Sequence, residues 1–140
     1  MFKRILVGYD GSLHARKAIE LALDLAQRYT AAVTAVAVAH IPDFADTRDE
    51  INGALQDAEK FFGGPLQQAA KRAAQMDVAL ETRVVPGHPA DVLVRLAEAE
   101  DCDLIVVGAR GLSGVKRYLM GSVSEAVVRH AHCPVLVVKG

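Results

Sequence analysis

The 140-residue sequence contains two cysteines, no tryptophan and few aromatic residues, and its charges nearly cancel. Cys102 and Cys133 are far apart in the sequence and indicate neither a disulfide framework nor a zinc site. Both adjoin predicted strands, so we expect reduced core residues. The formal net charge of −1 provides no basic field to attract nucleic acid or an anionic lipid surface.

Long hydrophobic runs are also missing, and none approaches the roughly 20 residues that a membrane-spanning helix needs. The N-terminal residues enter a predicted strand at once, which leaves no room for a signal peptide. We therefore expect neither a nucleic-acid partner nor a membrane partner, and a cytoplasmic location. Hydrophobic residues make up 51% of the chain, enough for the core of one compact domain over residues 1–140.

Apolar runs and helical periodicities alternate along the chain. Short apolar runs predict strands at residues 4–8, 32–40, 78–85, 103–107 and 134–139. Apolar residues at helical spacing predict helices at residues 15–26, 48–76, 90–100 and 123–130. This order predicts an α/β fold of the Rossmann-like kind, a single open five-stranded parallel sheet with helices on both faces. Right-handed crossovers and a reversal of winding after the third strand give the strand order 3-2-1-4-5.

The helical region 48–76 contains one local conflict, because Gly63-Gly64-Pro65 lies in its middle. Proline removes a backbone donor and clashes with the preceding turn, at about 3 kcal/mol in a helix interior. We expect a kink or a break there, with Pro65 restarting the helix at its first position.

Two glycine-containing turns follow strands that the order 3-2-1-4-5 places side by side. Residues 8–10 follow the first strand and residues 108–110 follow the fourth, so the two turns face each other across a crevice at the switch point. Anions and nucleotides bind at this place in open α/β sheets. Gly121 and Ser122 end the second loop, where they can offer backbone N–H groups and a hydroxyl at a helix N-terminus.

The same loop also has a purely structural explanation. Ser122 and Glu125 match a capping box, in which Ser122 caps the helix and Glu125 reaches back to it. Arg110, Lys116 and Arg117 can neutralise phosphates, but a solvated loop carries such residues for solubility as well.

Other kinds of site find little support in the sequence. His130 and His132 are two residues apart and do not face each other on a helix, so we do not expect a metal cluster. The sequence has no Gly-x-Ser-x-Gly elbow of an α/β-hydrolase and no Gly-x-x-x-x-Gly-Lys-Ser/Thr loop of a P-loop NTPase.

The spacing Gly108-x2-Gly111-x9-Gly121-Ser122 resembles the nucleotide-binding signature Gly-x2-Gly-x9-Gly-Ser/Thr of the universal stress protein family, UspA-like proteins included. The residues that lead to Ser12, the segment 87–89 and the segment 121–138 are similar to other parts of that family. The resemblance therefore covers nearly the whole chain. The family has the 3-2-1-4-5 sheet, and it divides into members that bind ATP and members that do not.

Because the signature is complete, the resemblance implies the ATP-binding branch. Carried over by position, Asp10 is expected at the adenosine moiety, and Val38 is expected to meet adenine, largely through its backbone. The resemblance places a third group around the ribose and phosphates: Gly108, Gly111, Gly121, Ser122 and Val123. Arg110 is added as a candidate for neutralising phosphate. No catalytic residue or metal ligand is assigned, and whether Mg²⁺ accompanies the nucleotide is left open.

The resemblance implies an ATP-binding stress-response protein that acts as a nucleotide-dependent sensor or adaptor. Two alternatives remain open, a slow ATP hydrolase or nucleotidyl-transfer enzyme, and a dimerisation module that binds no nucleotide. Apart from Asp10, no histidine or carboxylate can be placed beside the phosphates, which argues against the enzyme. The apolar last strand, residues 134–139, falls at a sheet edge that invites pairing with a second copy. We therefore expect a homodimer through this strand.

Overall fold

The computed structural model describes residues 1–41, 47–110 and 121–139, in which strands and helices alternate. The strands are β1 (Arg4–Tyr9), β2 (Ala32–His40), β3 (Leu80–Gly87), β4 (Leu104–Gly108) and β5 (Val135–Val138). The helices are α1 (Leu13–Tyr29), α2 (Arg48–Gln75), α3 (Pro89–Ala99) and α4 (Ser122–His130). Each predicted element is present. None of the helices in the described ranges is both long enough and apolar enough to cross a membrane.

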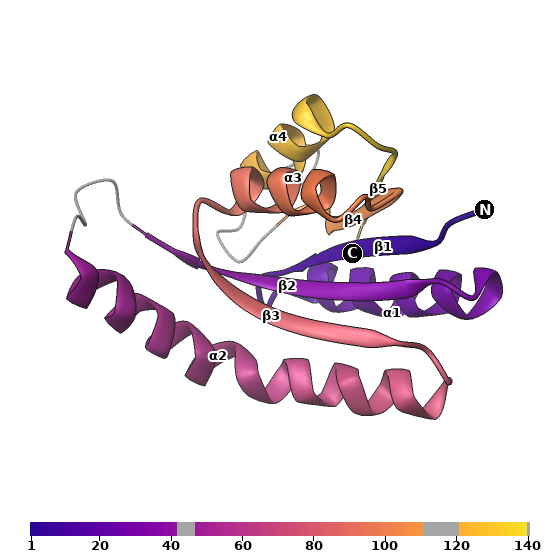
Figure 1. Cartoon of the computed structure of the whole chain (residues 1–140), viewed down its shortest axis with the longest axis horizontal. Helices are drawn as coiled ribbons and strands as arrows, with labels where there is room; N and C mark the ends of the chain where they lie inside the picture. Colours follow the sequence, from indigo (N-terminus) through magenta and orange to yellow (C-terminus); the bar gives the residue numbers. More distant parts are fainter. Residues whose placement is uncertain (42–46, 111–120, 140) are drawn as a thin grey trace.

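The strands form one parallel sheet in the order β3-β2-β1-β4-β5, which confirms the predicted topology. Helices α1 and α2 lie on one face of the sheet, and α3 and α4 lie on the other (Figure 1). One cluster of buried residues joins α1 and α2 to the sheet, and a second joins α3 and α4 to it. Because both faces of the central strands are covered, β1 and β4 read as continuous apolar runs.

Helix α1 packs on the sheet through a face made mostly of alanine, with Ala15, Ala18, Ile19, Ala22, Leu23 and Ala26 buried. Its first residue is fixed by a cap, because the Ser12 hydroxyl accepts a hydrogen bond from the Ala15 N–H at 3.1 Å. At its other end Thr30 takes the left-handed conformation, with φ of 55°. The helix therefore begins directly beside the carboxyl end of β1.

Strand β3 ends the sheet on one side, as its half-polar pattern predicts. Glu81 and Thr82 are exposed on it. Arg83 forms salt bridges with Glu81 and with Glu100, and these two carboxylates raise the pKa of the guanidinium. Strand β3 is thus tied to the chain between α3 and β4 by charge as well as by packing.

The predicted break in α2 is wrong, because Arg48 to Gln75 form one continuous helix with Pro65 inside it. The helix is bent rather than straight in Figure 1, which agrees with the alternative prediction of a kink. Packing on both sides of the proline outweighs the local cost. Ala58 is buried on one side of Pro65, and Leu66 and Ala69 are buried on the other. Pro65 itself is exposed, so water can reach the carbonyl that loses its helical donor.

Replacing Gly64 by alanine should raise the free energy of unfolding by about 0.5–1 kcal/mol. A Cβ at this position meets nothing within 4 Å, and alanine favours a helix interior over glycine by about that amount. Urea denaturation of wild type and Gly64→Ala measures the difference. Gly87→Ala is the control with the opposite sign, because its φ is +142° and its Cβ would lie 2.7 Å from Val92. A destabilised Gly64→Ala would contradict the continuous helix.

Candidate functional site

A cavity of about 180 Å³ lies where the chain leaves the carboxyl ends of β1 and β4. These two strands pair with each other, but the helix that follows β1 lies on one face of the sheet and the helix after β4 lies on the other. The two connections therefore diverge and leave a crevice between them, which is the usual ligand site of an open α/β sheet. The crevice predicted at the switch point is present.

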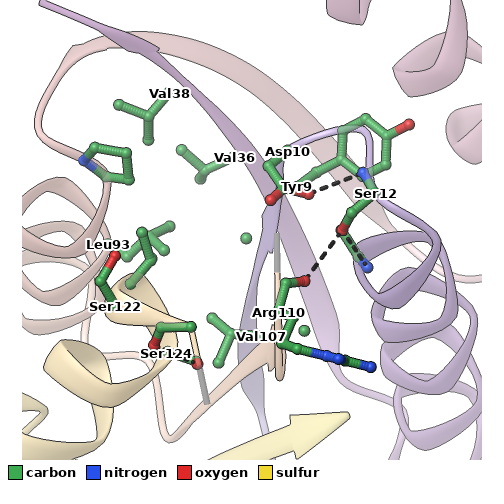
Figure 2. Close-up of a pocket in the computed structure, with 16 residues that line it drawn as sticks. Tyr9, Asp10, Ser12, Val36, Val38, Leu93, Val107, Arg110, Ser122 and Ser124 are labelled. Carbon is green, nitrogen blue, oxygen red and sulfur yellow. Dashed lines mark hydrogen bonds between the residues drawn. The ribbon is translucent and has the colours of Figure 1, made fainter. Parts of the chain in front are cut away.

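One wall of the cavity is apolar. Val36 and Val38 are two residues apart on β2, so their side chains point from the same face of the sheet. Leu93 of α3 lies beside them, and Pro89 and Val107 complete the apolar lining (Figure 2). Leu93 is buried whereas Val38 is half-buried, so this wall runs from the core to the mouth of the cavity. It can accept a flat apolar ring.

The opposite wall is polar and comes from the turns after β1 and β4. An oxygen of the Asp10 carboxylate accepts a hydrogen bond from the Ser12 N–H at 2.9 Å, which holds the side chain in place. The Ser12 hydroxyl in turn donates to the carbonyl of Arg110 at 3.5 Å. Figure 2 shows Asp10, Ser12 and Arg110 together on the side of the cavity that faces Val36 and Val38. This wall thus carries the Asp10 carboxylate and the backbone carbonyl of Arg110, whose side chain runs toward α1.

The third side of the cavity is the start of α4. The expected capping box is wrong, because Gly121 is the N-cap and Ser122 is the first helical residue, with no side-chain cap. The hydroxyl of Ser124 instead turns inward, 2.9 Å from the Ala109 carbonyl and 3.0 Å from the Gly121 carbonyl. Ser122 is exposed and lines the cavity. The cap therefore does not account for this serine.

Tyr9, the last residue of β1, also lines the cavity. Its ring lies edge-on to Phe62 of α2, with centroids 6.0 Å apart, and the residue is buried. Burial raises the pKa of Tyr9, the Asp10 carboxylate raises it further, and Arg16 opposes the change. The phenol is therefore neutral at physiological pH and cannot serve as a base there.

The cysteines and histidines lie outside the cavity lining. Burial raises the pKa of the Cys102 thiol to about 11 and also raises that of Cys133, so both thiols stay protonated at neutral pH. Within the described ranges, no three histidine, cysteine or carboxylate side chains come close enough together to hold a metal ion.

The sequence profile of the Universal stress protein family matches residues 1–139. The chain belongs to the universal stress protein family. It is 35% identical to universal stress protein MJ0531 of Methanocaldococcus jannaschii over 143 aligned residues, which cover 99% of this chain and 83% of that protein.

Solved universal stress proteins share the fold. UspA from Lactobacillus plantarum superposes with a TM-score of 0.86 at 28% identity, over 98% of this chain and 97% of that one. A universal stress protein in complex with cAMP superposes with a TM-score of 0.75 at 29% identity, again over 98% and 97% of the two chains. The sheet order and the four helices are thus those of the family.

The eight residues predicted for the site can now be placed in this universal stress protein fold. Gly111 lies outside the described residues, as do the candidate cations Lys116 and Arg117. The other seven line the cavity: Asp10, Val38, Gly108, Arg110, Gly121, Ser122 and Val123. They come from β2, the turn after β1, the end of β4 and the start of α4 with the residues just before it, so residues far apart in the sequence share one cavity.

The sequence did not predict Val36, Leu93 and Val107 of the apolar lining, or Ser124, whose hydroxyl turns inward. Val36 could have been predicted, because strand alternation puts it on the same face of the sheet as Val38. Leu93 and Val107 read as ordinary core residues, and nothing in their sequence pattern separates lining from core. Ser124 gave no signal either, because its partners are backbone carbonyls.

The sequence predicts that Gly108 lets the backbone approach a ligand closely. In the structure, Gly108 instead has a packing role against α1. A Cβ on Gly108 would lie 2.8 Å from the Cβ of His14 and 3.0 Å from the backbone nitrogen of Ala15. The first turn of α1 therefore sits directly on this glycine. The absence of a side chain lets α1 and β4 approach each other, which places the two cavity walls.

Gly108→Ala should therefore destabilise the fold by about 1–3 kcal/mol, because backbone atoms of α1 must move. Gly8→Ala is a matched control in the neighbouring strand. Its Cβ would come closest to the end of the Leu93 side chain, at 2.9 Å, which can rotate away, and would meet Val107 at an ordinary 3.5 Å, so the loss of stability should be smaller. Chemical denaturation of both variants tests the difference. Equal stability of Gly108→Ala and wild type would remove the packing role.

Proposed function

We propose that this universal stress protein binds ATP or a related adenine nucleotide in the cavity and acts as a nucleotide-dependent sensor or adaptor. The proposal depends on one observation: an apolar wall and a helix N-terminus without a side-chain cap line the same cavity. A nucleotide has the matching two ends, a flat base and an anionic phosphate chain.

The apolar wall suits the adenosine end. Val36, Val38 and Leu93 offer a slot for the base, and the Asp10 carboxylate on the facing wall can accept hydrogen bonds from ribose hydroxyls. The volume of about 180 Å³ is below the roughly 300–1,000 Å³ of sites that enclose a whole drug-sized ligand. The base and ribose would therefore enter the cavity, and the phosphates would extend toward its mouth.

The start of α4 suits the phosphate end. The first turn of a helix presents unpaired N–H groups and the positive end of the helix dipole, and no side chain caps this one. Gly121 and Ser122 line the cavity there, and Ser122 is free to donate its hydroxyl to an anion. Arg110 lines the same cavity from the turn after β4.

A relative supports the choice of ligand class. The universal stress protein solved in complex with cAMP is 29% identical to this chain over nearly its whole length. Its ligand is an adenine nucleotide, which agrees with the site chemistry argued above. ATP is the finer part of the proposal and depends on the complete glycine signature of residues 108–122.

An adaptor fits this site better than an enzyme. In the described part of the lining, Asp10 is the only carboxylate, and one of its oxygens is already engaged by the Ser12 N–H. No histidine lines the cavity to act as a base at neutral pH. Steady-state phosphate release with excess ATP distinguishes the two functions, because only an enzyme gives sustained turnover that Gly121→Val abolishes.

Ser122→Ala should weaken ATP binding about tenfold to a hundredfold, since it removes a hydrogen bond to a charged group worth about 1.5–3 kcal/mol. The melting temperature should stay near that of the wild type, because Ser122 does not cap α4. Gly121→Val should abolish binding by filling the lining, while its φ of −66° and ψ of 158° suit any residue. Calorimetric titration at fixed salt measures all three affinities, with Gly64→Ala as the control. Wild-type affinity in both site variants would refute the assignment.

We also propose that the protein is a homodimer through β5. The strand ends the sheet order, and its residues Val135 to Val138 are only half-buried. The carbonyl of Pro134 accepts a hydrogen bond from Ile105 of β4, and that of Val138 accepts one from Ala109, the residue after β4. Strand alternation then directs the backbone groups of Val135 and Val137 away from the sheet, where a second copy can pair with them.

Val137→Pro tests this dimer without disturbing the ladder to β4. Proline removes an outward N–H, and an edge strand tolerates it there. Sedimentation at tens of micromolar should show a dimer for the wild type and a monomer for the variant, with similar circular dichroism. A monomeric wild type, or an unchanged dimer in a folded variant, would place the interface elsewhere or remove it.

A further inference from the structure

Two buried hydroxyls converge on the start of the glycine loop. In the described part of the chain, the buried polar or charged residues are Ser12, 7% exposed, and Ser124, 2% exposed. Ser12 belongs to the start of α1 and Ser124 to the start of α4, yet both hydroxyls reach carbonyls of consecutive residues, Arg110 and Ala109. Buried hydroxyls are placed for the bonds that they make, and these bonds hold the chain where it leaves β4.

The bonds of Ser124 join both ends of the loop that follows Ala109. Its hydroxyl lies 2.9 Å from the Ala109 carbonyl and 3.0 Å from the Gly121 carbonyl, and its single proton is shared between them. The Gly121 N–H donates to the same Ala109 carbonyl at 2.6 Å. Ala109, Gly121 and Ser124 therefore form a clasp that fixes the end of β4 against the start of α4.

We infer that Ser124 is a positioning residue for the phosphate end of the site. The inference rests on the proposed nucleotide binding and adds to it how the N–H groups at residues 121 and 122 are held. The hydrogen bonds of the clasp involve neither Val38 nor Asp10, which are assigned to the adenosine end. Loss of the Ser124 hydroxyl should therefore weaken the contribution of phosphates to affinity and leave adenosine binding nearly unchanged.

The structure also explains why a variant at this position should fold. The Ala109 carbonyl keeps the Gly121 N–H as a donor, and the Gly121 carbonyl keeps the Glu125 N–H at 3.0 Å. Ser124→Ala thus leaves no buried carbonyl without a donor, which is the costly outcome of deleting a hydrogen-bond partner. The hydroxyl restrains the clasp, while the backbone bonds form its framework.

The test compares the affinities of ATP and adenosine in each variant at one salt concentration. In Ser124→Ala the preference for ATP over adenosine should fall about threefold to tenfold relative to wild type, as expected for one lost neutral hydrogen bond. Ser124→Cys keeps nearly the same volume with a weaker donor and should give an intermediate preference. Val127→Ala is the matched control, because Val127 is fully buried in the same helix and its apolar side chain cannot hydrogen-bond the clasp carbonyls. It should lower the melting temperature and leave the preference unchanged.

Each outcome decides the matter. An unchanged preference in Ser124→Ala, or an equal fall in Val127→Ala, would make the hydroxyl a purely structural group and overturn the inference. If Ser124→Ala does not fold, Ser124→Cys decides in the same way, and wild-type preference in it overturns the inference. If the wild type binds neither ATP nor adenosine, the proposed function fails and this inference fails with it. The wild-type titration thus separates the two kinds of failure.

Discussion

The parallel pairing of β1 with β4 is the constraint on which the site depends. It brings together two strands whose following helices lie on opposite faces, so the crevice exists only if this pair forms in this register. Asp103 fixes the register from the far end, since its carboxylate accepts the N–H groups of Lys3 at 2.8 Å and Arg4 at 3.1 Å. A slip of one residue would turn the side chains of β4 to the wrong faces.

The fold could be predicted from the sequence because several independent signals agree on it. Apolar runs, helical periods and short turns alternate regularly, and the handedness of crossovers leaves few topologies. The predicted break in α2 was wrong because the rule behind it considers only neighbouring residues, whereas contacts with distant residues stabilise the helix. Pro65 has a strong tendency to break a helix, yet Ala58 and Leu66 on either side of it are buried, and Leu66 belongs to the core that joins α2 to the sheet. A rule that counts only neighbouring residues does not include that packing.

The site was predictable in its polar part and not in its apolar part. The glycine spacing predicts Gly121 and Ser122, and the turn after the first strand predicts Asp10. Leu93 and Val36 line the cavity but have the composition of core residues, so only the folded geometry separates the two uses. Gly108 shows a subtler case, because its position was predicted while its reason was not. The absence of a side chain at Gly108 is needed for the contact of α1 with β4, whether or not a ligand is bound.

Ala109 connects the start of α4 to β5, the edge strand proposed for dimerisation. The Ala109 N–H donates to the Val138 carbonyl at the end of β5 at 2.8 Å, while the Ala109 carbonyl accepts from Gly121 at the start of α4. The backbone of Ala109 thus joins the start of α4 to the last residue of β5 through two hydrogen bonds, a route by which a ligand held at α4 could bias the edge strand. Linkage makes any such effect reciprocal, so a nucleotide that favours pairing of β5 is bound more tightly by the paired form, by the same factor. In the nucleotide-dependent sensor proposed above, Ala109 would provide this connection between the ligand and the edge strand.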